Sequence, residues 1–155
     1  AQAEFMVKPV TGFELRFIAK YSNVQAMYNG RMEQVPYVPV WRGLFNAAYD
    51  WKKHGWKFDI TVQINGASRL PQMTDPETGE ALATASPVFP TLFAQVSKTI
   101  KRWEIYVGGE NLTDFRQKNP VLGASDPYGT GFDASRVWGP IFGAMGYAGV
   151  RFKIQ

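Results

Sequence analysis

"YDWKKHGWKFDITVQIN", residues 49–65, is the stretch of sequence that decides the fold. From Trp56 to Asn65, apolar and polar residues alternate without a break. The apolar positions are Trp56, Phe58, Ile60, Val62 and Ile64. Uninterrupted alternation is typical of a strand with one apolar and one polar face. We therefore predict a strand over residues 56–65 whose apolar side faces a hydrophobic environment.

The run before it, "WRGLFNAAYDW" (residues 41–51), alternates in the same way, although Leu44 and Ala48 interrupt its polar face. The link "KKHG" between the two runs is short and polar. Its glycine, Gly55, can adopt the positive φ that a tight turn requires. Two alternating runs joined by such a link predict a β-hairpin.

The alternation recurs along the rest of the chain. The other candidate strands are "AEFMV" (3–7), "GFELRFIAKYS" (12–22), "TLFAQVSKTI" (91–100), "WEIYVGGENL" (103–112) and "GAMGYAGVRFKIQ" (143–155). The first is cut short by the start of the sequence. We predict six strands and one partial strand with no amphipathic helix, and therefore an all-β antiparallel fold.

The connections between these strands alternate in length. Short links are predicted at 9–12, 52–55 and 101–102, and long Gly/Pro-rich ones at 23–36, 70–87 and 113–137. This pattern is typical of outer-membrane barrels, in which periplasmic turns are short and extracellular loops are long. Trp51, Trp56 and Trp103 adjoin short links, as an aromatic girdle at one membrane interface requires, although aromatic residues also flank hairpins in other proteins.

The composition fits one domain that interleaves apolar and polar residues. The chain has 155 residues, 45% of them hydrophobic and 15% aromatic, with a mean hydropathy of −0.23. It has no cysteine, which excludes disulfides and thiolate metal sites. The net charge is +4, but the Lys and Arg residues are scattered, so nucleic acid is not an expected partner. No apolar run is long enough for a membrane-spanning helix.

The polar faces of the strands indicate whether the apolar faces contact lipid or a protein core. They carry a mixed, partly neutral set suited to a wet lumen: Thr61, Gln63, Asn65, Gln95, Ser97, Thr99, Glu104 and Tyr106. A soluble sheet would more often present Lys and Glu to solvent. We therefore predict a transmembrane barrel whose lipid-facing residues include Phe58, Ile60, Val62 and Ile64. Seven strands cannot close a barrel of even strand number, so the chain is expected to belong to something larger.

The last third of the chain resembles the carboxy-terminal end of TonB-dependent outer-membrane receptors, especially the Bacteroidetes kind. The segments that carry the resemblance are "GGENLTDFRQKNP" (108–120), "DPYG" (126–129), "FDASRVWGP" (132–140) and "YAGVRFKI" (147–154). "VPYVPVWRGLFNAAYDW" (35–51) and the strand before "GGENL" also look like late barrel strands of that family. The resemblance covers most of the chain from about residue 12 to residue 154.

The resemblance implies that residues 1–155 are about the last six or seven strands of a 22-stranded barrel in the bacterial outer membrane. The plug domain and the segment that contacts TonB would lie upstream. The implied function is import of a scarce nutrient, such as a siderophore, cobalamin, glycan, peptide or metal complex, driven through TonB. Expected partners are the rest of the receptor, TonB, and outer-membrane lipid and lipopolysaccharide. The family resemblance also allows a surface lipoprotein lid.

Two segments carry candidate functional residues. The charged, aromatic-bearing loop 113–137 contains the candidate ligand or partner contacts Arg116, Lys118, Asp126, Tyr128, Asp133 and Arg136. "YAGVRFKI" resembles the terminal strand signal read by the outer-membrane assembly machinery. Its residues would be Tyr147, Gly149, Phe152 and Ile154. The alternative interpretations are a loop ordered against its neighbours and a plain terminal strand.

No motif predicts covalent chemistry, a metal or a cofactor. The only histidine, His54, lies in a short link, and we expect it to be solvated. Asp75 and Glu77 in "MTDPETGE" favour a Pro-Gly turn over acid–base chemistry or a calcium site. We therefore expect no enzymatic activity. A passive porin-like barrel and a soluble β-sheet interaction module are the alternatives that the patterning leaves open.

Overall fold

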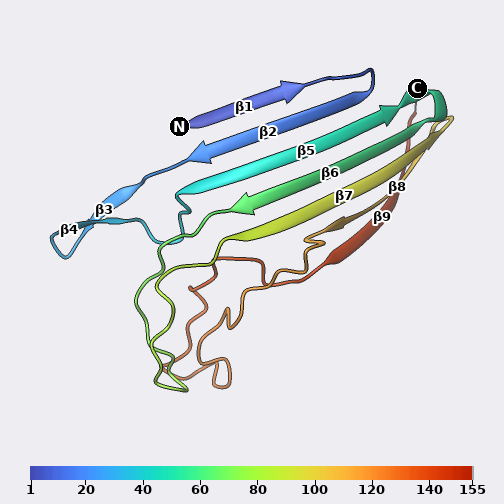
Figure 1. Ribbon diagram of the computed structural model, residues 1–155. Coiled ribbons are helices and arrows are strands. Elements are labelled where there is room, and N and C mark those ends of the chain that lie inside the picture. Colours follow the sequence, from blue (N-terminus) through green and yellow to red (C-terminus); the bar gives the residue numbers. More distant parts are fainter. Residues whose placement is uncertain (155) are drawn as a thin grey trace.

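A computed structural model describes residues 1–154; Gln155, which follows the predicted assembly signal, lies outside the described residues. The predicted all-β antiparallel fold is confirmed. One seven-stranded sheet has the order β1-β2-β5-β6-β7-β8-β9, and a two-stranded sheet pairs β3 with β4 (Figure 1). The bounds are β1 Gln2–Val7, β2 Phe13–Tyr21, β3 Gln25–Tyr28, β4 Arg31–Gln34, β5 Trp41–Trp51, β6 Trp56–Asn65, β7 Phe89–Ile100, β8 Trp103–Glu110 and β9 Met145–Phe152.

The short connections meet at one end of the large sheet, as predicted (Figure 1). The β5–β6 link is a single 3₁₀ turn, Lys52–His54, that ends at Gly55 in the left-handed conformation with φ 64°. A Cβ atom on Gly55 would lie 2.6 Å from the carbonyl oxygen of Thr99 near the end of strand β7. Both the backbone conformation and the close approach therefore require glycine here.

The long connections lie at the opposite end of the sheet, which we call the loop end; the end with the short connections is the turn end. The segment predicted as a loop over 23–36 contains the β3–β4 hairpin. Asn29 and Gly30 form its turn with φ of 48° and 78°. An Asn-Gly pair with both residues at positive φ favours a two-residue hairpin turn. This dipeptide was the signal in the sequence from which the hairpin could have been predicted.

The register of the strands separates apolar from polar side chains as the alternation predicted. Phe17 is opposite Phe45, and Phe45 is opposite Val62. On the other face, Asn46 is opposite Thr61, and Ser97 is opposite Tyr106. Since successive residues of a strand point to opposite faces, one sheet face is mainly apolar, with Lys98 between Trp56 and Ile105 at the turn end, and the other is mainly polar.

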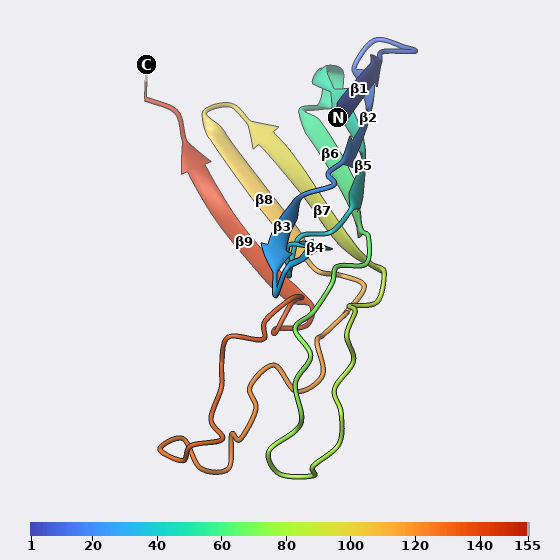
Figure 2. The ribbon, with the colours of Figure 1, turned by 90° about the vertical axis from the view of Figure 1, so that its left-hand side faces the viewer.

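The sheet is curved and open. Figure 2 shows β1 and β2 at one margin and β9 at the other. Within residues 1–154, β1 pairs only with β2 and β9 only with β8. Within residues 1–154, the buried hydrophobic residues are few, and they belong to the loop end: Leu70, Phe89 and Leu122. The sheet therefore lacks a conventional apolar core on either face.

Candidate functional site

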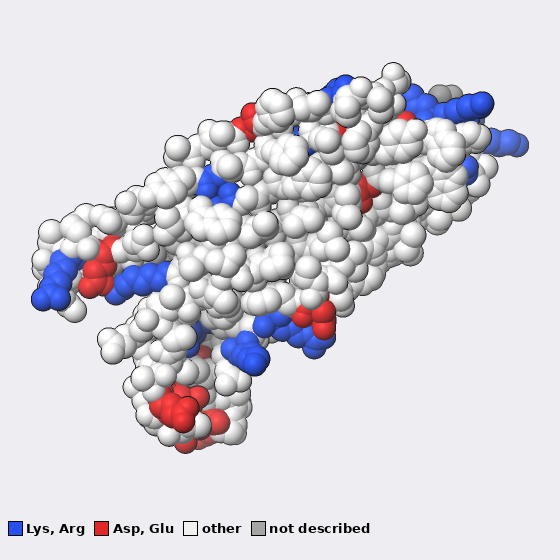
Figure 3. All heavy atoms as spheres, viewed as in Figure 1, with Lys and Arg blue, Asp and Glu red and all other residues white. Residues whose placement is uncertain are grey.

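The apolar face of the large sheet is exposed. Phe58, Ile60 and Ile64 are between 38% and 42% exposed, and Val62 is half-buried. These four residues are the ones that the sequence predicts to face lipid. The same face continues across β8 and β9, where Ile105, Val107 and Val150 are at least half exposed. In the view of Figure 3, the body of the sheet shows few charged atoms, which gather mainly at its two ends and on the loops.

In β7 and β8, the polar face is the more shielded one. Glu104 is 8% exposed, whereas its neighbour Ile105 is 50% exposed. Ser97 and Thr91 are also buried. Side chains on the inner side of a curved sheet crowd one another, whereas those on the outer side splay apart. The burial difference therefore places the polar residues on the inner side of the curve.

Ion pairs and hydrogen bonds join several charged side chains on this inner face toward the turn end. Arg151 donates to the Glu104 carboxylate at 3.2 Å, and Lys8 lies 3.1 Å from Glu14. Asn46 Nδ2 donates to both carboxylate oxygens of Asp59, at 3.1 and 3.2 Å. The carboxylates named here therefore have partners, as in a structural polar lining.

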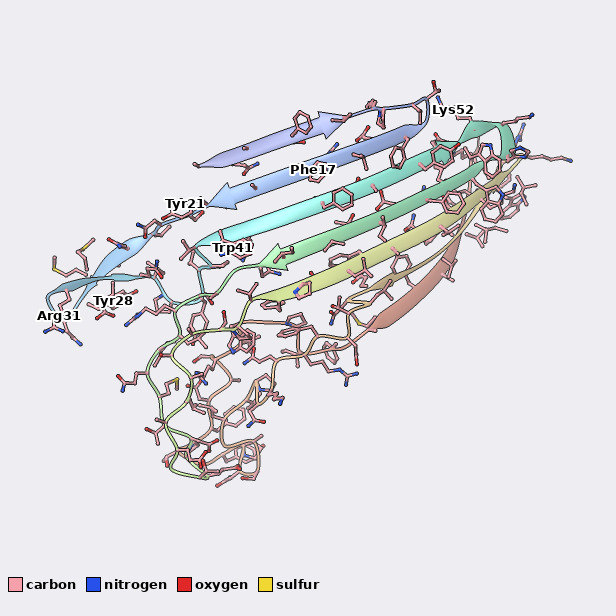
Figure 4. The ribbon with its side chains drawn as sticks, viewed as in Figure 1. Phe17, Tyr21, Tyr28, Arg31, Trp41 and Lys52 are labelled. Atoms are coloured by element: carbon pink, nitrogen blue, oxygen red, sulfur yellow. The ribbon has the colours of Figure 1, made fainter. Side chains whose placement is uncertain are left out.

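Aromatic residues mark both ends of the exposed apolar face. At the turn end, Trp51 is opposite Trp56, and the Trp103 ring lies 4.7 Å from that of Phe152. At the loop end, Tyr21 is opposite Trp41, and both side chains are exposed (Figure 4). The second pair was missed from the sequence because only residues beside short links were considered.

The candidate loop contacts are not equivalent. Tyr128 is 100% exposed, and Asp126 and Lys118 are exposed with it. Arg136, in contrast, is 6% exposed, and its guanidinium donates to the carbonyl oxygen of Ala83 in the 66–88 loop. Arg136 therefore connects two loops, whereas the other three lie on the loop surface.

Two carboxylates stabilise the loop's own conformation. Asp114 Oδ1 accepts hydrogen bonds from Arg116 at 2.8 Å and from the Ala144 amide at 2.9 Å. These bonds, that of Arg116 first, lower the pKa of Asp114. Asp133 accepts a bond from the Ser135 amide at 2.7 Å, which lowers its pKa as well. Both groups therefore favour the charged form.

Gln117 holds the base of this loop together. It is 5% exposed, and its Nε2 donates to the carbonyl oxygen of Arg136 at 2.7 Å. Its Oε1 accepts from the amides of Trp138 at 2.8 Å and Gly139 at 3.1 Å. One side chain thus satisfies three backbone groups. Beside it, the Phe89 and Phe115 rings stack at 4.4 Å, with Trp138 against both.

The β3–β4 hairpin is joined to the 66–88 loop by Arg69. Its guanidinium pairs with Glu33 and lies 5.5 Å from the centre of the Tyr28 ring. At the far tip, Ser125 Oγ donates to Glu77 at 2.5 Å, and this bond joins the 66–88 loop to the 111–144 segment. The three long loops therefore form one connected assembly at the loop end.

The residues of the candidate assembly signal divide between the two sheet faces. The register places Tyr147 and Gly149 with the polar residues and Phe152 with the apolar ones. Ile154 follows β9 and is 87% exposed. Gly149 leaves room for the Tyr106 hydroxyl, because a Cβ atom at this position would lie 2.3 Å from it.

Within residues 1–154, the structure has no cluster of side chains suited to a metal ion. No group of three or more His, Cys, Asp and Glu side chains there could hold a metal ion. His54 packs against Trp51 with ring centres 4.4 Å apart and is exposed.

Across residues 1–154, no helix has the length and apolar character needed to cross a membrane. Comparison with protein-family models, curated proteins and solved structures finds no match to the chain.

Proposed function

We propose that this chain is part of the wall of a transmembrane β-barrel in the bacterial outer membrane. The observation that carries the proposal is the reversed burial of β8, where charged Glu104 is shielded and adjacent Ile105 is half exposed. A soluble sheet packs its apolar face against another layer. A membrane strand turns that face to lipid and its polar face to the lumen.

The dimensions of the apolar face support this proposal. Trp41 and Trp51 begin and end β5 on that face, so they are ten residues apart. At about 3.4 Å per residue, this is roughly 34 Å along the strand. With the roughly 35–45° tilt of barrel strands, the height is about 24–28 Å, which matches the ~25 Å apolar band of outer-membrane barrels. The aromatic pairs at the two ends would then be the two interfacial girdles.

The open margins of the sheet fit a part of a larger barrel. Unpaired backbone groups at a lipid-exposed edge cost several kcal/mol each, so β1 and β9 need further strands beside them. We propose that the rest of the same receptor, about 22 strands in all, supplies these strands. The turn end would face the periplasm and the loop assembly the outside, in contact with lipid and lipopolysaccharide.

We further propose that the barrel belongs to a TonB-dependent receptor that imports a scarce nutrient. The sequence resemblance at residues 108–154 supports this step. In this role the chain supplies wall and loops and performs no covalent chemistry. An upstream plug would lie against the polar face, an upstream segment would contact TonB, and a lipoprotein lid would sit above the loops.

Two measurements test the proposal at its two levels. The full-length protein should be monodisperse in detergent and aggregate without it; a monodisperse protein in plain buffer contradicts the membrane location and favours the soluble module. Nutrient uptake by cells should stop when TonB is deleted. Uptake that persists without TonB favours a passive porin-like barrel while leaving the wall assignment intact.

A further inference from the structure

We propose that Lys20 and Arg42 form a binding site for an anionic group, a carboxylate or a phosphate, on the polar face at the loop end. The two residues are directly opposite each other in the β2–β5 register. Tyr21 and Trp41, labelled in Figure 4, are their chain neighbours and show where on the sheet the pair lies. As a statement about transported cargo, the inference rests on the proposed function, in which this face lines the passage.

The pairing of two like charges is what sets these residues apart. Elsewhere on this face, oppositely charged residues are opposite each other, as in Asp50–Lys57 and Glu104–Arg151. Among the paired strands of the described sheet, Lys20–Arg42 is the one pair that opposes two like charges. Directly opposed like charges destabilise a sheet unless something neutralises them.

The protein itself supplies no such neutralising group. No ion pair formed within residues 1–154 includes Lys20 or Arg42. The next row of the sheet toward the turn end contains Glu4, which lies 3.6 Å from Arg16. The two cations therefore keep their hydrogen-bond donors for an external acceptor.

A small hollow lies at this pair. Its volume is about 130 Å³, and it is lined by Lys20, Ser22, Tyr37, Val38, Pro39 and Arg42. This is roughly four times the ~30 Å³ that one water molecule occupies in the liquid. The space fits a carboxylate or phosphate group, so the rest of a nutrient-sized ligand would extend out of the hollow.

The chemistry of the lining suits an oxyanion. Arginine presents a planar fork of donors that binds carboxylate or phosphate through two parallel bonds, and lysine adds a compact charge. Ser22 and Tyr37 add hydroxyl groups that can donate. Tyr37 has φ of 65°, and its amide donates to the carbonyl oxygen of Arg69 at 2.9 Å, so the connected loops hold one wall of the hollow.

Isothermal titration of the full-length protein in detergent with citrate and with inorganic phosphate tests the site. We expect saturable binding of at least one anion, and the comparison of the two shows whether carboxylate or phosphate is preferred. Arg42→Gln and Lys20→Gln should each weaken this binding at least tenfold. Lys53→Gln removes the same charge from the turn end and should change the affinity less than twofold.

Absence of saturable binding for both anions, or native affinity in Arg42→Gln, would overturn the site. Arg42→Lys serves if the glutamine variant does not fold: it keeps the charge but loses the fork, so its affinity should lie between those of the native protein and Lys20→Gln. The titration measures binding by the purified protein and does not require TonB or uptake by cells. A failed anion site and a failed transporter assignment therefore give different results.

Discussion

The Tyr147 hydroxyl donates a 3.0 Å hydrogen bond to Oε1 of Gln95, although β8 separates their strands. The bond is possible because Gly108 lies between them in the register and has no side chain. A Cβ atom on Gly108 would lie 2.5 Å from the Tyr147 ring. The polar face is thus connected across three strands at this level.

Gly108→Ala is expected to displace the Tyr147 ring and break its bond to Gln95. The loss should be about 1 kcal/mol of unfolding free energy, the usual net value of one hydrogen bond. Gly43→Ala is the control, because a Cβ atom there meets nothing within 4 Å. It should leave stability unchanged or raise it slightly by restricting the unfolded chain. Reversible unfolding in detergent measures both, and equal losses would contradict this role of Gly108.

The face assignment predicts different costs for the same substitution at two positions of β6. Ile60→Arg should destabilise the protein by roughly 2–4 kcal/mol if its side chain faces mid-bilayer. Gln63→Arg, on the polar face, should be tolerated. Unfolding measured in lipid bilayers gives both values, and equal costs at the two positions would show that the faces are assigned wrongly.

Gln117→Ala should loosen the loop assembly without unfolding the sheet. It removes the partner of three backbone groups and should cost about 1–3 kcal/mol locally. Hydrogen exchange at Trp138 and Gly139 should accelerate, while exchange in β6 stays slow. Lys118→Ala alters an exposed neighbour and is the matched control. Unchanged hydrogen exchange at Trp138 and Gly139 in Gln117→Ala would contradict the proposal that Gln117 holds the base of the loop together.

The contact between Asp114 and Ala144 should open in acid. The pKa of Asp114 lies below its ordinary value of 3.8 because the charged form accepts bonds from Arg116 and the Ala144 amide. A lowered carboxyl pKa stabilises the fold above 3.8, and this contribution disappears as pH falls through the lower folded pKa. Exchange at the Ala144 amide should therefore rise only below pH 3.8, after correction for the intrinsic pH dependence. Asp114→Asn should abolish this rise; a rise that persists would implicate another group.

The strands were predictable because their side chains repeat every two residues. The bounds of β5 and β6 equal the alternating runs 41–51 and 56–65. The loop assembly was not, because it depends on contacts between segments far apart in sequence, such as Gln117 with Trp138 and Arg136 with Ala83. Charge and length alone made Arg136 a surface candidate, whereas the fold buries it.

The candidate anion site shows the same limit. Lys20 and Arg42 lie in separate runs, and neither is unusual in the sequence. Only the register brings the two cations opposite each other. The hollow beside them also needs Tyr37, whose conformation is fixed by the Arg69 carbonyl of a later loop.

The reversed burial of β8 affects how the protein behaves in water before it is assembled. In water, burial of apolar side chains normally stabilises the folded state, but in this sheet Ile105, Val107 and Val150 are exposed. In water, the folded sheet therefore gains little hydrophobic stabilisation and is prone to aggregate. In the proposed outer-membrane barrel, this chain would need a chaperone that shields the apolar face until the sheet is inserted.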